Sequence, residues 1–246
     1  MPAWILALAS GAIGGATLLI GSALAWFLRV PPKLTAAITA FGAGVLISAL
    51  AYELVQEAAE DGGLLPTVLG TLVGAVVFVG ADALLTRAGA GDRKSAKGSG
   101  GGGGAAIAAG ALIDGVPESI VLGLSVAQGG AGAAISVPIV AAVAISNLPE
   151  GLSSTVGMKA DGRSARYVFT VWGGIAAVSA ISALVGFLVF ATAPGAVVAF
   201  VTTVAAGAIL AMISNTMIPE AFDRDDVMTG LYAVLGFLTA FVLHSV

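Results

Sequence analysis

Residues 3–28 read AWILALASGAIGGATLLIGSALAWFL and contain no charged side chain. An α-helix rises about 1.5 Å per residue, so roughly 20 apolar residues cross the hydrocarbon core of a bilayer. No positively charged segment precedes this stretch, as one would in a cleavable signal peptide. The stretch therefore predicts a first transmembrane helix.

The composition of the whole chain points to the same class of protein. Hydrophobic residues make up 58% of the 246 positions and charged residues only 10%, whereas a soluble domain carries about 25% charged residues. The 35 glycines are typical of membrane helices that pack closely. The absence of cysteine excludes disulfides, thiolate metal sites and cysteine nucleophiles, and the net charge of −4 argues against nucleic acid as a partner.

Glycine, proline and charge clusters divide the chain into apolar segments of spanning length. These segments cover residues 4–28, 34–58, 64–86, 105–126, 133–158, 167–191, 196–222 and 228–245. The segment 88–104 combines charged residues with a glycine run, and we expect it to be a flexible loop. The sequence thus predicts a single all-α integral membrane domain, an eight-transmembrane-helix bundle surrounded by lipid, whose glycine-rich faces would permit a homodimer.

The basic residues are distributed unevenly between the connecting segments. All ten follow the first, third, fifth or seventh predicted span, which places them on one side of an eight-span arrangement. Cytoplasmic loops of membrane proteins carry an excess of Lys and Arg. We therefore expect the basic loops, including 88–104, in the cytoplasm and both termini on the extracytoplasmic side, with the plasma membrane as the default location.

Two consecutive spans carry acidic residues near their midpoints. The fourth contains Asp114-Gly-Val-Pro-Glu118, and the fifth contains Ser146-Asn-Leu-Pro-Glu-Gly151. Asp114 and Glu118 are four residues apart and share one helix face, as do Ser146 and Glu150. A charged group in hydrocarbon costs at least about 2.5–3.5 kcal/mol, so such residues usually face a cavity and serve a function. We expect the two helices to be antiparallel neighbours whose acids lie at similar depth.

Each motif also contains a proline directly before its glutamate. A proline inside a helix removes the hydrogen bond to the carbonyl four residues earlier, which frees the carbonyls of Ile113 and Ile145. Carboxylates beside free carbonyl oxygens at mid-membrane are ligands for a hard cation. No Lys or Arg lies within these spans, so a bound cation or protons must balance the acids. The alternative is that the prolines merely kink the helices and the acids are protonated or hydrogen-bonded.

The two motifs resemble the successive proline–glutamate motifs of the ZIP (Zrt/Irt-like) family of divalent metal transporters. In that family they read His-Asn-x-Pro-Glu-Gly or close variants and hold the transported metal. The resemblance extends to the eight spans, to Phe41-Gly-Ala-Gly-Val45 in the second span and to Ile218-Pro-Glu220 in the seventh. It implies a transport site lined by Asp114, Glu118, Ser146, Asn147 and Glu150. It also implies that Glu53 lies toward the outer entrance and Glu220 toward the cytoplasmic exit.

The chain departs from the family pattern in its ligands. Asp114 and Ser146 stand where the family commonly has His or another strong ligand, and Gly115 replaces a common Asn. The expected site therefore has oxygen ligands and no imidazole; His244, the single histidine, is expected to be an exposed terminal residue. Zinc favours nitrogen and sulfur ligands, whereas oxygen ligands suit manganese better, with Fe(II) intermediate. The family resemblance favours zinc, whereas the oxygen ligands favour manganese. Zinc, manganese and Fe(II) therefore all stay open.

The expected function is transport of a divalent metal cation toward the cytoplasm by alternating access. The metal is then a substrate, with no cofactor and no enzymatic activity. Two alternatives stay open. One is a transport-inactive or regulatory ZIP-like protein that binds metal, suggested by the missing His ligands. The other is an intramembrane hydrolase that uses two carboxylates, although the chain has no Cys, and no His beside the acidic motifs, for a cysteine or zinc mechanism.

Overall fold

The computed structural model describes residues 1–87, 103–129, 134–224 and 227–245, and these residues are almost entirely helical, without a β-strand. The helical segments in chain order are α1 (Ala3–Phe27), α2 (Pro32–Ala49), η1 (Leu50–Gln56), α3 (Glu57–Gly62), α4 (Leu64–Leu85), α5 (Gly103–Gln128), α6 (Val137–Ala160), α7 (Ala165–Phe190), α8 (Gly195–Met212), η4 (Ile213–Met217), α9 (Ile218–Arg224) and α10 (Thr229–Ser245). The segments named η are π-helical.

Seven helical stretches within the described residues are long and apolar enough to cross a membrane. The prediction of a helical, multi-pass membrane protein is therefore confirmed. The predicted span 34–58 corresponds to α2, η1 and α3, which form one stretch from Pro32 to Gly62. The predicted span 196–222 corresponds to α8, η4 and α9. α10 is apolar but has only 17 residues, about 25 Å of helix, so an eighth crossing stays a prediction.

The predicted loop 88–104 lies outside the described residues, except that 103–104 begin α5. Connections elsewhere are short. Pro31 and Pro194 precede α2 and α8 with extended backbone, where their missing N–H groups cost no helical hydrogen bond. Ser136 and Ser164 accept hydrogen bonds from backbone N–H groups at the starts of α6 and α7.

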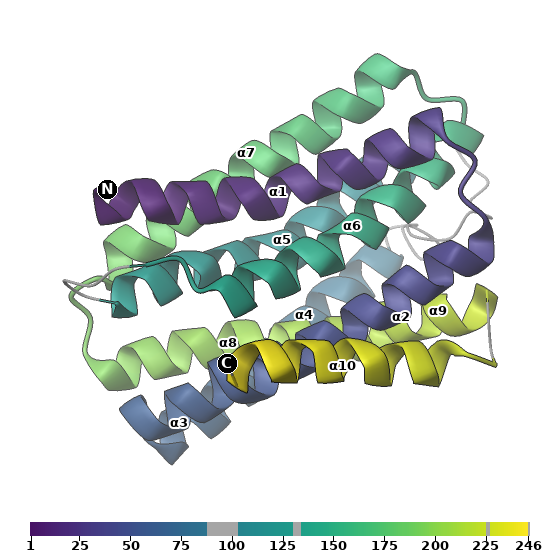
Figure 1. The fold of residues 1–246 in the computed structure, drawn as a ribbon. Coiled ribbons are helices and arrows are strands. Elements are labelled where there is room, and N and C mark those ends of the chain that lie inside the picture. The colour runs from purple at the N-terminus through teal and green to yellow at the C-terminus, as the bar shows by residue number, and fades with distance from the viewer. Residues whose placement is uncertain (88–102, 130–133, 225–226, 246) are drawn as a thin grey trace.

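The helices pack in two groups. α1 packs against α6 and α7, and α5 packs against α7; we call this group bundle A (α1, α5, α6 and α7). α4 packs against α8, and α10 packs against α2; we call this group bundle B (α2 to α4 with η1, and α8 to α10 with η4). Figure 1 shows α1 and α7 on the upper side and α8 and α10 on the lower side. The bundles meet where α2 packs against α6 and α5 packs against α8.

Glycines allow close approach inside each bundle. A Cβ at Gly21 of α1 would collide with the carbonyl oxygen of Leu148 in α6, and one at Gly151 of α6 would collide with that of Leu18 in α1. The same reciprocal contact joins α5 with α7 at Gly123 and Gly186, α4 with α8 at Gly74 and Gly207, and α2 with α10 at Gly44 and Gly236. In lipid, the hydrophobic effect does not drive helices together, so their association depends on close van der Waals contact of this kind.

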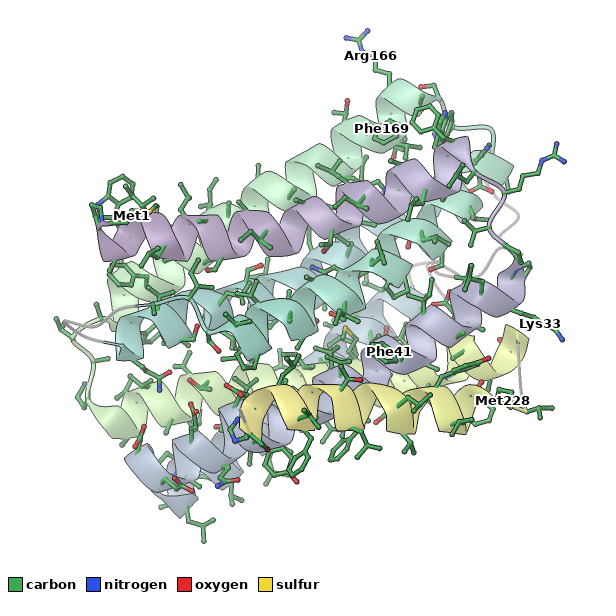
Figure 2. The ribbon with its side chains drawn as sticks, in the orientation of Figure 1. Met1, Lys33, Phe41, Arg166, Phe169 and Met228 are labelled. Atoms are coloured by element: carbon green, nitrogen blue, oxygen red, sulfur yellow. The ribbon has the colours of Figure 1, made fainter. Side chains whose placement is uncertain are left out.

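The surface of the bundle is apolar along its length and charged at its ends. Val76 of α4 is 71% exposed and Leu188 of α7 is 60% exposed, as expected for side chains that face lipid. Lys33 and Arg166 lie at the end opposite Met1 (Figure 2). We call the end where α1 begins and α10 ends the terminal end, and the opposite end, which holds Lys33 and Arg166, the basic end.

Candidate metal site

A small cavity lies between bundles A and B. Its volume is about 20 Å³, which is room for one water molecule or a small ion. Side chains of six helical segments line it: Thr39, Glu118, Ser146, Pro149, Glu150, Met212, Met217 and Glu220. Three carboxylates from α5, α6 and α9 therefore border one space. Two of them belong to the proline–glutamate motifs, whereas the third, Glu220, was expected toward the cytoplasmic exit.

The polar groups around this cavity are largely removed from solvent. Glu118 is 2% exposed and Ser146 is 3% exposed, whereas Glu150 and Glu220 are partly buried. The Ser146 hydroxyl donates a hydrogen bond to the carbonyl oxygen of Val143 at 3.0 Å. That bond uses the hydroxyl proton and leaves oxygen lone pairs available to a cation. The cavity thus offers oxygen ligands, which suit a divalent cation.

Pro117 and Pro149 lie inside α5 and α6, as predicted. Pro149 also lines the cavity, so the interruption of the helical hydrogen bonding falls at the site itself. A Cβ at Gly42 of α2 would lie 3.3 Å from the carbonyl oxygen of Ile145. The carbonyl that Pro149 frees therefore points to the seam between the bundles, where a residue without a side chain faces it.

The methionines and the π-helical segment at this cavity were not predicted. Met212 ends α8 and Met217 ends η4, just before Glu220. π-helical turns are rare and frequently occur at functional sites because they alter the directions of the side chains that follow. Thr39 on α2 was also missed. A single threonine or methionine in an apolar run carries no sequence signal for a site.

Beyond Glu118 toward the terminal end, the seam is apolar. A second cavity of about 10 Å³ borders Glu118 and is otherwise lined by apolar side chains: Leu46, Ala49, Leu50, Leu54, Val121, Ile139, Ala142, Val143 and Ile209. Toward the basic end, the first cavity is bordered by Glu150 and Glu220. Glu118 therefore lies at the boundary between an apolar and a polar half of the seam.

Three predicted site residues do not line the cavity. Asp114 is 3% exposed in α5, one turn from Glu118. Asn147 donates from Nδ2 to the carbonyl oxygen of Gly14 at 3.0 Å, toward α1. Glu53 lies in η1 with Oε1 2.6 Å from Nδ1 of His244. Among the described residues, no three His, Cys, Asp or Glu side chains are grouped closely enough to hold a metal ion.

The acids that follow Glu220 in the sequence are only partly described. Asp223 is exposed in α9, near the basic end, while Asp225 and Asp226 lie outside the described residues. α5 and α6 are in contact, as expected, but α5 packs mainly against α7 and α6 mainly against α1.

No protein-family model and no curated protein matches the sequence.

Proposed function

We propose that this chain is a divalent metal transporter of the ZIP type that moves a cation toward the cytoplasm between bundles A and B. The observation that carries the proposal is the cavity bordered by Glu118, Glu150 and Glu220, three acids from different helices, in the interior of an apolar bundle. Acids inside a membrane domain are costly, and they usually mark the path of an ion or substrate. A divalent cation is the substrate that suits a path bordered by three carboxylates.

The proposed orientation places the basic end in the cytoplasm and both termini outside. It follows from the positive-inside rule and from the positions of Lys33 and Arg166 opposite Met1 (Figure 2). In this arrangement α10 is the eighth crossing, accommodated by local thinning of the bilayer around a short helix. The plasma membrane is the proposed location.

The proposed mechanism is alternating access. The aliphatic side chains beyond Glu118 close the path toward the terminal end, while Glu150 and Glu220 lead toward the basic end. We propose that a shift of bundle A against bundle B opens the apolar half of the seam toward the terminal end. The reciprocal glycine contacts lie inside each bundle, so they favour movement of the bundles as units. In the part of the chain that the structure describes, no three His, Cys, Asp or Glu side chains are close enough to hold a metal ion together. The shift would therefore also bring ligands closer around the ion.

The ligand set bears on which cation is carried. Carboxylates and the Ser146 hydroxyl suit manganese, whereas the thioethers of Met212 and Met217 are softer ligands that suit zinc or Fe(II) better. Together they favour a transition-metal cation over magnesium or calcium. Zinc, manganese and Fe(II) remain the proposed substrates.

The proposal is tested by metal uptake into proteoliposomes containing the purified protein. Wild type and Asp161→Asn, a change of an exposed acid at the basic end of α6, are expected to accumulate at least one of the three metals. Glu150→Gln should reduce that uptake at least tenfold. Binding without accumulation by the wild type would instead support the transport-inactive alternative.

A further inference from the structure

The single imidazole of the chain contacts a carboxylate that is remote in sequence. Nδ1 of His244 in α10 lies 2.6 Å from Oε1 of Glu53 in η1. The Glu53 side chain is 8% exposed, whereas the His244 side chain is 34% exposed. The pair therefore joins a nearly buried carboxylate to a histidine that is accessible at the terminal end, where we expected only an exposed terminal residue.

Aromatic contacts fix the orientation of this imidazole. The ring of Tyr52 stacks on that of His244, with ring centroids 5.6 Å apart and an angle of 25° between their planes. Tyr52 also contacts Phe241 at a centroid distance of 5.3 Å. Stacking keeps Nδ1 of His244 directed at Glu53. Because the ring is already ordered, the binding of a ligand would cost little further side-chain entropy, as in a preorganised site.

Acidic residues follow the pair in α3. Glu57 is exposed one helical turn beyond Glu53 and interacts electrostatically with Glu53, Asp61, His244 and Glu60. Such a group of negative charges raises the local concentration of cations. The acids alone would attract any cation, but the imidazole adds a nitrogen ligand that the central cavity lacks.

We propose that His244 and Glu53 form a capture site for a divalent transition-metal cation, with zinc as the preferred ion. A histidine nitrogen and a carboxylate oxygen are a common zinc ligand pair. When the cation binds, it replaces the hydrogen bond between Nδ1 and Oε1: Nδ1 binds as a deprotonated nitrogen, and a neutral imidazole then carries its single proton on Nε2. With two protein ligands, and water in the other positions, the site binds weakly and releases the ion readily.

This inference rests on the proposed function for its place in a transport path, but its binding chemistry can be tested separately. The background is the Glu118→Gln/Glu150→Gln/Glu220→Gln triple variant of the full chain, which removes the three carboxylates at the central cavity. Zinc binding to this protein in detergent is measured by titration calorimetry. One weak zinc site is expected to remain.

His244→Gln is the decisive change in that background. Glutamine can donate a hydrogen bond to Glu53 and so preserve a purely structural contact, but it is a poor zinc ligand. We expect zinc affinity to fall at least tenfold, while Tyr52→Phe, which keeps the stacked ring, retains it. Unchanged zinc affinity in His244→Gln would overturn the capture site.

Uptake distinguishes failure of this inference from failure of the proposed function. With the central site intact, His244→Gln should raise the KM for zinc uptake several-fold and leave the maximal rate unchanged. If His244→Gln has no effect while Glu150→Gln abolishes uptake, only the capture site is wrong. If the wild type shows no uptake but His244→Gln still loses zinc affinity, the proposed function fails and the binding site stands.

Discussion

Nδ2 of Asn147 lies 3.0 Å from the carbonyl oxygen of Gly14 and joins α6 to α1, one residue along the chain from Ser146 of the cavity. A carbonyl oxygen only accepts hydrogen bonds, so the NH₂ group of the amide must face it. Asn147 is 3% exposed, and its amide nitrogen is engaged away from the cavity. In this arrangement Asn147 positions α6, although its place in the proline–glutamate motif suggested a ligand.

We predict that Asn147→Asp impairs the protein more than Asn147→Ala. Aspartate keeps an oxygen ligand but loses the donor, and it places a negative charge against the Gly14 carbonyl. The loss of a buried hydrogen bond costs about 1–3 kcal/mol, which should lower the thermal midpoint in detergent and the uptake rate. A ligand role for Asn147 would be indicated if Asn147→Asp bound zinc as tightly as wild type or more tightly.

Gly151→Ala should destabilise bundle A. A Cβ at position 151 would collide with the backbone of Leu18 in α1, and overpacking of this kind costs about 1–3 kcal/mol. Gly173→Ala in α7 is the matched control because nothing lies within 4 Å of a Cβ there. Thermal unfolding should show a lower midpoint for Gly151→Ala only. Equal midpoints for the two variants would show that the α1–α6 contact is looser than described.

A buried chain of hydrogen bonds joins α1, α6 and α7 near the basic end. Trp172 Nε1 donates to Thr155 Oγ1 at 2.9 Å, and Thr155 donates to Ser22 Oγ at 3.0 Å. Thr155→Val removes both bonds, and we expect a loss of about 1–3 kcal/mol. Thr239→Val in α10 is the control, since Thr239 is exposed and bonds only to Leu235 of its own helix. Chemical unfolding should give a lower free energy of unfolding for Thr155→Val than for Thr239→Val. A similar small decrease in both variants would show that the hydrogen bonds of Thr155 do not stabilise the bundle.

Pro149→Ala should weaken metal binding without unfolding α6. Alanine restores an N–H at position 149, which can bond to the Ile145 carbonyl and withdraw it from the seam. We expect a lower zinc affinity with unchanged helix content by circular dichroism. Pro138→Ala, at the start of the same helix, is the control because the first helical N–H groups have no partner within the helix. Equal zinc affinities in the two variants would remove the freed carbonyl from the ligand set.

The sequence was sufficient to predict a bundle of apolar helices, and it singled out the three acids that border the cavity, although Asp114 and Glu53 do not line it. Uncharged runs longer than a bilayer crossing have few structural alternatives, and buried acids such as Glu118 and Glu150 stand out because they are costly in lipid. Helical periodicity also placed Ser146 and Glu150 on one face, as the cavity shows.

The sequence pattern could not predict contacts between helices that lie far apart in the sequence. Periodicity gives the faces of one helix but not the neighbour that each face meets. The pairing of Glu53 with His244 spans 191 positions of the chain, and Asn147 faces α1 even though its neighbour Ser146 faces the cavity. The π-helical segments η1 and η4 were missed because an inserted residue leaves an apolar run unchanged in composition.

The most direct test of the account is zinc accumulation in proteoliposomes by wild type and Glu118→Gln, measured alongside zinc binding. Glu118 borders both the apolar and the polar half of the seam, so a cation that crosses between the bundles must pass it. The account predicts that Glu118→Gln remains folded, binds zinc more weakly and accumulates at least tenfold less zinc than wild type. Equal accumulation by wild type and Glu118→Gln would contradict it.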